Sequence, residues 1–205
     1  KQMRVQDLIA SYRSRGHKRA NIDPLGIMER PHMPNLELAY HHLSDADLEE
    51  TFQTGGFHYE DGIAKLSDLI VALESTYCSS IGAEYMHIVD PSEHKWVQQR
   101  LEVSRSQPNF SSEQKRAILE RLTAADGLEK FLQRRYPGTK RFGLEGGESL
   151  IPMLHEFLQR LGSHGVLESV ISMAHRGRLY VLVNILGQNP GELFDEFEGN
   201  ITQEK

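Results

Sequence analysis

The spacing of apolar residues along the chain predicts a protein built mainly from helices. Leu66, Leu69, Ile70, Leu73 and Tyr77 recur at helical intervals and would form one apolar face. The same criteria predict helices over residues 5–15, 46–52, 91–102, 112–122, 128–132, 150–161 and 179–186, and from Pro190 onward. An extended loop is expected over residues 15–35, where glycines and prolines are frequent.

Several of these helices begin at residues that cap a helix N-terminus. Asp90 precedes Pro91, and Ser111 stands before Gln114 at the spacing of a capping box. Ser44 precedes the stretch ADLEETF in a similar way. Such side chains accept hydrogen bonds from the free backbone N–H groups of the first turn, so they indicate where each helix starts.

A single segment has the pattern of a buried strand. Residues 166–173, VLESVISM, form a short apolar run, and the helix predicted over residues 179–186 follows directly. A buried strand that leads into a helix is typical of α/β folds, in which ligands bind at the carboxyl ends of the strands. We therefore expect a helix-rich α/β protein.

Composition narrows the class of protein. The 205 residues are 39% apolar and 25% charged, which is ordinary for a globular chain with a sizeable core. The net charge of -6 argues against nucleic-acid binding, which usually needs a basic face. No apolar run approaches the roughly 20 residues of a membrane-spanning helix.

The single cysteine and the chain ends add two expectations. Cys78 cannot form an internal disulfide, which favours a reducing, intracellular setting, and an inert thiol is favoured over a reactive one. The chain begins without methionine and stops soon after a helical pattern, at FEGNITQEK. We therefore expect a fragment of a longer protein.

Candidate chemistry lies in the stretch VISMAHRGRLYVLVN, where His175, Arg176 and Arg178 interrupt an apolar run. Charged side chains within an apolar segment need opposite charges or hydrogen-bond acceptors to compensate them. One interpretation is a bound phosphate or carboxylate, held by the arginines and by the free N–H groups at the start of the helix. The other, slightly favoured by spacing alone, is pairing with acidic residues of the chain itself: Glu145, Glu148 or Glu196.

Other polar residues leave similar alternatives open. His175 suits a proton shuttle or a donor to a carboxylate, but the residue alone favours a core histidine. The segment KRFGLEGGE, which contains Phe142 and a glycine pair before a helix, suits an anion site or an ordinary loop. Three further histidines lack the spacing of a metal motif and are expected in a solvated loop: His41, His42 and His58.

Four motifs together resemble one family, in order and in spacing. They are SYRSRGHKRANIDPLG, IGAEYMHI, KRFGLEGGESLIPML and MAHRGRLYVLVNILG, and the closing LFDEFEGN also fits. The chain resembles the thiamine-diphosphate-dependent dehydrogenase (decarboxylase) component of 2-oxoglutarate dehydrogenase complexes, from about Val5 to Gly199. Four separate motifs make this resemblance specific.

The resemblance implies an activity in the tricarboxylic acid cycle. The family decarboxylates 2-oxoglutarate on thiamine diphosphate with Mg²⁺, and it passes the succinyl group to the lipoyl domain of a succinyltransferase partner. A homodimer is implied for the full-length protein, located in the bacterial cytoplasm or, in a eukaryote, in the mitochondrial matrix. At the matching positions His175 is implied as the active-site histidine, Arg176 as a contact of a cofactor or substrate anion, and Phe142 as a wall of the substrate pocket.

The resemblance also implies a division of the chain. Residues 1–139 would form a helical N-terminal region, and residues 140–205 would begin a thiamine-diphosphate-binding α/β domain at its first strand–helix unit. The family's second active-site histidine and its Gly-Asp-Gly…Asn motif for magnesium and the diphosphate would follow after Lys205. No metal ligand is therefore expected in this chain, and the isolated fragment is expected to be inactive.

One departure and two alternatives remain. Tyr180 stands where the family usually has asparagine. The related 2-oxoadipate dehydrogenase component shares similar motifs but usually has tyrosine at the position of Phe142. From a different class of protein, the chain would be a non-catalytic helical assembly module in which His175 is structural.

Overall fold

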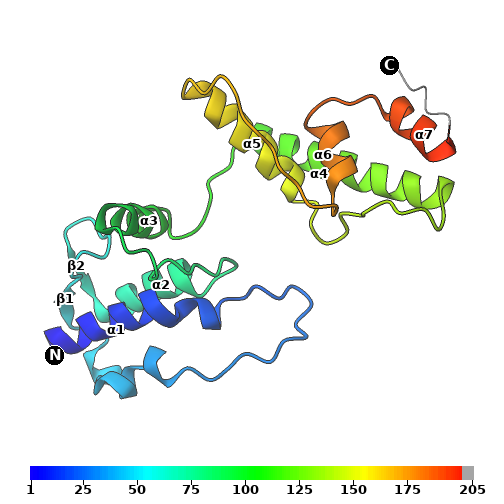
Figure 1. The fold of residues 1–205 in the computed structure, drawn as a ribbon. Helices are drawn as coiled ribbons and strands as arrows, with labels where there is room; N and C mark the ends of the chain where they lie inside the picture. The colour runs from blue at the N-terminus through cyan, green and yellow to red at the C-terminus, as the bar shows by residue number, and fades with distance from the viewer. Residues whose placement is uncertain (200–205) are drawn as a thin grey trace. The chain divides into compact units, whose positions relative to one another are not determined.

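The computed structural model describes residues 1–199, apart from the side chain of Glu196, and confirms a helix-rich chain (Figure 1). The described residues form two compact units that divide between Asn109 and Phe110. Each unit has its own apolar core. Within the described residues, no helix combines the length and the apolar composition that crossing a lipid bilayer requires.

The first unit contains three α-helices and one pair of strands. Its elements are α1 Gln2–Arg15, β1 Thr51–Gln53, β2 Ile63–Lys65, α2 Leu66–Tyr77 and α3 Pro91–Ser104. Short 3-10 turns lie between them, at Gly16–Arg19, Pro34–Leu36, Leu38–His41 and Asp45–Asp47. The predicted helices over residues 5–15, 66–77 and 91–102 are confirmed, and Asp90 caps α3 as expected through the N–H groups of Ser92 and Glu93.

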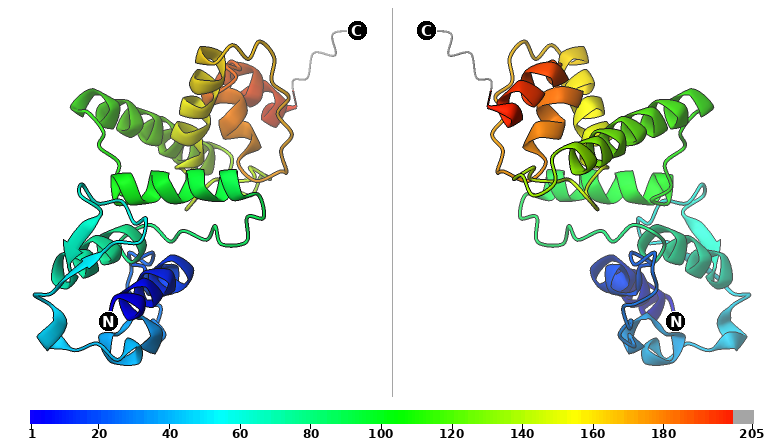
Figure 2. Two further views of the ribbon diagram at one scale, coloured as in Figure 1. Left: turned by 90° about the vertical axis from the view of Figure 1, so that its left-hand side faces the viewer. Right: turned by 90° about the vertical axis from the view of Figure 1, so that its right-hand side faces the viewer.

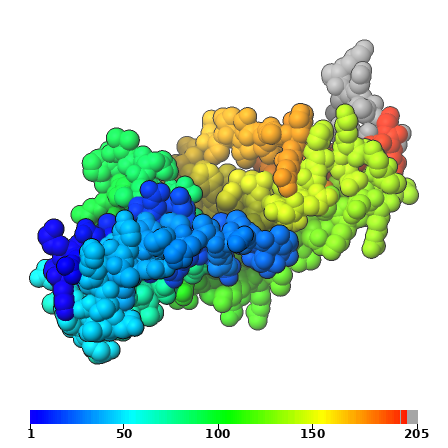
Figure 3. Space-filling model, turned by 90° about the horizontal axis from the view of Figure 1, so that it is seen from below, coloured from blue at the N-terminus to red at the C-terminus, as the bar shows by residue number. Residues whose placement is uncertain are grey.

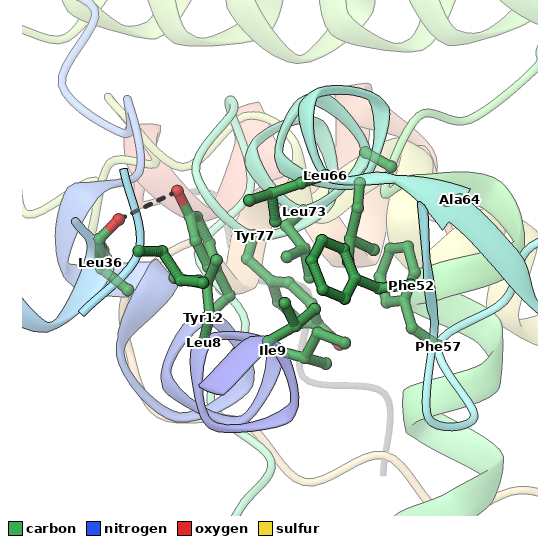
Figure 4. Packing of buried hydrophobic residues seen from close by; sticks show 14 of the residues in the cluster. Leu8, Ile9, Tyr12, Leu36, Phe52, Phe57, Ala64, Leu66, Leu73 and Tyr77 are labelled. Atoms are coloured by element: carbon green, nitrogen blue, oxygen red, sulfur yellow. Dashed lines mark hydrogen bonds between the residues drawn. The ribbon is translucent and has the colours of Figure 1, made fainter. Parts of the chain in front are cut away.

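The core of the first unit lies between α1, α2 and the strand pair (Figure 4). Leu66 and Leu73 of α2 are fully buried, and Tyr12 of α1 packs among the same side chains. Burial of each such leucine contributes about 1.5–3 kcal/mol. The Tyr12 hydroxyl donates to the carbonyl oxygen of Leu36 at 3.3 Å, which ties the following loop to α1.

The helix predicted over residues 46–52 is wrong. Ser44 and Asp47 do form a capping box, but it encloses only the 3-10 turn Asp45–Asp47. The chain then enters β1, which pairs antiparallel with β2 so that Phe52 lies opposite Ala64, and both side chains are buried. Burial of Phe52 through strand pairing therefore overrides the helical tendency of ADLEETF, because pairing with a distant segment is not visible in local spacing.

The loop predicted over residues 15–35 is confirmed between the short turns at Gly16–Arg19 and Pro34–Leu36. Its exposed part is visible on the surface in Figure 3. The Asp23 carboxylate accepts the N–H groups of Leu25 and Met28 at 3.0 and 2.6 Å. These backbone donors stabilise the ionised carboxylate and lower the pKa of Asp23. Asp23 thus stabilises a turn within a loop that has no regular secondary structure.

The second unit is built on a long helix. Its helices are α4 Ser112–Arg135, α5 Leu150–Ser163, α6 Arg178–Asn184 and α7 Pro190–Glu198. The capping box of Ser111 and Gln114 starts α4 as predicted, but the two helices expected over residues 112–122 and 128–132 are one continuous helix. Both α5 and α6 pack against α4 and against each other (Figure 2), and α7 contacts α4 through the rings of Phe131 and Phe194.

The strand predicted over residues 166–173 is wrong. The segment returns from α5 toward α6 without regular secondary structure (Figure 1). Leu167 and Val170 are 95% and 99% exposed. A strand needs a neighbouring strand to satisfy its N–H and C=O groups, and the described part of the second unit contains none. The apolar run alone could not supply that partner.

The observed structure does not test two expectations about the domains of this chain. The boundary between residues 139 and 140 stays a prediction, as does the thiamine-diphosphate-binding fold expected over residues 140–205. Residues 200–205, which contain the last part of FEGNITQEK, lie outside the described residues.

Cys78 follows the last residue of α2 and is partly buried. Burial raises the pKa of its thiol to about 11. The thiolate is the reactive form of cysteine, so little of it exists at neutral pH. This agrees with the interpretation of Cys78 as an inert thiol.

Candidate functional site

Two of the predicted site residues lie together at the surface of the second unit. The rings of Phe142 and His175 are stacked, with centroids 4.7 Å apart and planes inclined by 24°. Phe142 is 41% exposed, and His175 is also exposed. In the described residues His175 is therefore not a core histidine, which removes the interpretation that the residue alone had favoured.

Backbone hydrogen bonds hold the two segments in this arrangement. The N–H of Gly177 donates to the carbonyl oxygen of Phe142 at 2.7 Å. The N–H of Arg178 donates to the carbonyl oxygen of His175 at 3.1 Å. Phe142 has a φ of 49°, a left-handed conformation that is uncommon for a bulky residue. Strain of this kind costs about 1–3 kcal/mol, persists only where the surroundings impose it, and often occurs at functional sites.

These bonds correct part of the anion-site prediction. The first N–H groups at the start of α6 were expected to be free for a ligand. Those of Gly177 and Arg178 instead bond to carbonyl oxygens of the chain. These two N–H groups are therefore not available to an anion, and the side chains of Arg176 and Arg178 are the charged donors at this site.

Arg176 and Arg178 flank the stacked pair. A terminal nitrogen of Arg176, Nη2, donates to the backbone carbonyl oxygen of Glu145 at 2.6 Å. Nη2 of Arg178 lies 3.4 Å from Nδ1 of His175. A guanidinium offers five N–H donors, so one bond to a carbonyl leaves most of the donors of Arg176 available.

Pairing of these arginines with acids is not found for the described carboxylates. Glu145 contributes its backbone carbonyl to Arg176, and the Glu148 carboxylate accepts the N–H of Gly146 at 2.9 Å. The third expected partner, the Glu196 side chain, lies outside the described part of the chain. The exposed Arg176 guanidinium and His175 imidazole, with the half-buried Arg178 beside them, can therefore meet an anionic ligand from solvent.

Gly177 makes the close approach of the two segments possible. It has a φ of 73°, and a Cβ atom at this position would lie 2.6 Å from Cδ1 of the buried Leu144. Any larger residue would meet both backbone strain and this contact. The glycine between the two arginines thus fits the packing of Leu144.

We expect Gly177→Ala to destabilise the second unit by about 2 kcal/mol, because backbone strain and overpacking against Leu144 add together. Gly187→Ala is the matched control, since Gly187 has a φ of 75° but open space around its Cα. Its cost should be about 1 kcal/mol. Hydrogen exchange of peptides from α4 to α6 would measure the difference, and equal losses in both variants would contradict the role of Leu144.

The burial of polar groups from three residues behind the site was not predicted. Glu129 of α4 and Tyr180 of α6 are buried, and the Nε atom of Arg141 is buried although its side chain is partly exposed. Glu129 lies on the buried face of α4 with Ala125 and Leu132, at helical spacing. A carboxylate on an otherwise apolar stripe was the sequence signal that could have drawn attention to it.

The remaining histidines form no metal site in the described residues. His42 and His58 are exposed as expected, but the expectation of a solvated loop is wrong for His41. It is buried in the 3-10 turn Leu38–His41, and its Nε2 lies 3.0 Å from the carbonyl oxygen of Asn35. No group of three or more histidine, cysteine, aspartate or glutamate side chains capable of holding a metal ion occurs between residues 1 and 199.

Comparison with known proteins finds similar sequences along nearly the whole chain. Three relatives named 2-oxoglutarate dehydrogenase E1 component are similar to it. Those of Azotobacter vinelandii and Cupriavidus necator are 53% and 49% identical, each over 97% of this chain and 21% of the relative. That of Haemophilus influenzae is 42% identical over 100% of this chain and 22% of the relative. No family model matches the chain.

These relatives confirm the resemblance seen in the four motifs. The chain is homologous to 2-oxoglutarate dehydrogenase E1 components over nearly all of its residues. It spans about a fifth of the length of the curated relatives it matches.

Proposed function

We propose that this chain is part of an enzyme that decarboxylates 2-oxoglutarate and transfers the succinyl group to a lipoyl domain of a succinyltransferase partner. The observation that supports this most directly is the contact between Phe142 and His175. Both residues were implied as site residues by separate motifs, and they stack in a unit of a chain that is 53% identical to an E1 component. An assembly module would not require this exposed, strained arrangement.

Each side chain has a role that its chemistry allows. His175, exposed beside Phe142, can donate a hydrogen bond to the 2-oxo acid and transfer a proton. Arg176 can hold a carboxylate or phosphate with the guanidinium donors that the Glu145 carbonyl does not use. The Phe142 ring offers an apolar wall without a hydrogen-bond donor, which limits the length of substrate that it accommodates.

The cofactor would be held largely by other parts of the enzyme. When bound, thiamine diphosphate supplies the electron sink for decarboxylation. The described residues do not fit its magnesium ion, because they contain no cluster of metal-binding side chains. We therefore assign His175 and Phe142 to the substrate, and Arg176 to an anion of the substrate or the cofactor.

The proposal also covers assembly and location. A homodimer is expected for the full-length enzyme, as the resemblance implies. The three relatives come from bacteria, which supports the cytoplasm rather than a mitochondrial matrix as the location.

Substrate preference tests this function against that of a 2-oxoadipate dehydrogenase component. The full-length enzyme should show a kcat/KM for 2-oxoglutarate roughly 10–200 times that for 2-oxoadipate, the range expected for one methylene group. Phe142→Tyr should narrow this ratio, because the added hydroxyl can donate a hydrogen bond to the displaced carboxylate of the longer acid.

Phe157→Tyr is the matched control, since Phe157 is an exposed phenylalanine of α5 in the same unit. It should leave the ratio unchanged. An equal or reversed preference in the unmodified enzyme would reject the assignment to 2-oxoglutarate. Absence of turnover with both acids would favour the assembly module.

A further inference from the structure

A cluster of unpaired polar atoms is buried behind the candidate site. Within the described residues, Glu129 Oε1, Arg141 Nε and the Tyr180 hydroxyl have no hydrogen-bond partner. Buried polar atoms are nearly always paired, so three such atoms in one unit call for an explanation. They come from α4, from the segment before Phe142 and from α6.

The three atoms are chemically complementary. Arg141 Nε–H and the Tyr180 hydroxyl are donors, whereas Glu129 Oε1 is an acceptor that can take more than one hydrogen bond. Arg141 Nε already lies 3.8 Å from Glu129 Oε1. Burial and the nearby Glu129 carboxylate raise the pKa of Tyr180, so its phenol stays protonated and can donate.

The other oxygen of Glu129 fixes the segment that carries Phe142. Glu129 Oε2 accepts the N–H of Leu144 at 2.9 Å. Glu129 therefore faces both Arg141 and Leu144, the residues at the two ends of the turn that contains Phe142. The carbonyl oxygen of Phe142 also accepts the N–H of Gly177. These contacts together explain how a bulky residue is kept at a φ of 49°.

We infer that Glu129 is a positioning residue that holds Phe142 against His175, and that Tyr180 assists it by donating to the same carboxylate. Tyr180 stands where the family usually has asparagine, and a hydrogen bond from its hydroxyl to Glu129 would give this departure a structural role. The inference rests on the proposed function only for the use of the stacked pair in turnover. The positioning itself can be tested without turnover.

The first test uses nuclear magnetic resonance of the 205-residue chain with labelled phenylalanine and histidine. Glu129→Gln keeps the size of the side chain but removes its charge. The nuclear Overhauser contact between the Phe142 and His175 rings should fall severalfold, while the helical circular dichroism is retained. Glu120→Gln, at an exposed position of the same helix, should leave the contact intact.

Tyr180→Phe removes only the hydroxyl and should weaken the same ring contact to a smaller extent. In the Glu129→Gln background its effect should shrink, because the carboxylate that it serves is gone. An unchanged ring contact in Glu129→Gln would overturn the role of Glu129. An effect of Tyr180→Phe that is equal in both backgrounds would overturn the role of Tyr180.

The second test is turnover by the full-length enzyme. Glu129→Gln should lower kcat/KM for 2-oxoglutarate about tenfold, in proportion to the loss of the ring contact. Loss of turnover with the ring contact intact would overturn the inference. Loss of the contact with turnover unchanged would leave the positioning in place but would contradict the proposed use of the pair, so the two failures are distinguishable.

Discussion

The proposed function predicts that replacing His175 with alanine lowers 2-oxoglutarate turnover of the full-length enzyme by roughly a hundredfold or more. This is the loss typical of removing a general acid–base group. The structure allows the effect to be separated from unfolding. His175 is exposed, and its side-chain contacts among the described residues are with the Phe142 ring and the Arg178 guanidinium.

The measurement pairs 2-oxoglutarate turnover, with an artificial electron acceptor, with cofactor affinity followed by fluorescence quenching. His175→Ala should reduce the first and spare the second. His164→Ala is the control, because His164 is also exposed in the same unit and bonds to the carbonyl oxygen of Arg160 in its own helix end. Normal turnover with a lower melting temperature would show that His175 has a structural role instead.

The elements that the sequence predicted best are those whose signals are local. The i, i+3, i+4 spacing from Leu66 to Tyr77 and the capping side chain of Asp90 correspond closely to the observed α2 and α3. The strand pair was missed because it depends on contact between Phe52 and Ala64, which local spacing does not report. The strand predicted over residues 166–173 was wrong for the opposite reason. Its composition suits a strand, but no partner strand exists for it among the described residues.

The candidate site likewise depends on contacts between distant segments that local sequence patterns do not report. Its residue types pointed to anion chemistry, but the choice of Phe142 and His175 came from the resemblance to a family. Their contact depends on the left-handed conformation of Phe142. Glycine and asparagine usually adopt this conformation, so a phenylalanine gives no sign of it in the sequence. The supporting role of Glu129 depends on the N–H of Leu144, which reaches the carboxylate only once the chain has folded back on α4.

A buried charge network in the first unit was also not predicted. Glu102 of α3 is 1% exposed, and its carboxylate accepts hydrogen bonds from Arg13 Nε at 2.7 Å and from the Tyr77 hydroxyl at 2.7 Å. The backbone N–H of His58 adds a third donor at 3.3 Å. Burial and the charge of Glu102 raise the pKa of Tyr77, so the phenol remains a donor. One carboxylate thus joins α1, α2 and α3.

Glu102→Ala should therefore destabilise the first unit by about 3 kcal/mol, the lower end of the cost of removing one partner of a buried ion pair, because the Arg13 guanidinium is partly buried and would lose its compensating charge. The double variant Arg13→Met with Glu102→Leu should lose much less, because it leaves neither charge buried without a partner. Urea unfolding followed by tryptophan fluorescence is a suitable measurement, since Trp96 is the single tryptophan and lies in α3 of this unit. If the double variant were as unstable as Glu102→Ala, lost packing around position 102, rather than the unpaired charge of Arg13, would account for the loss.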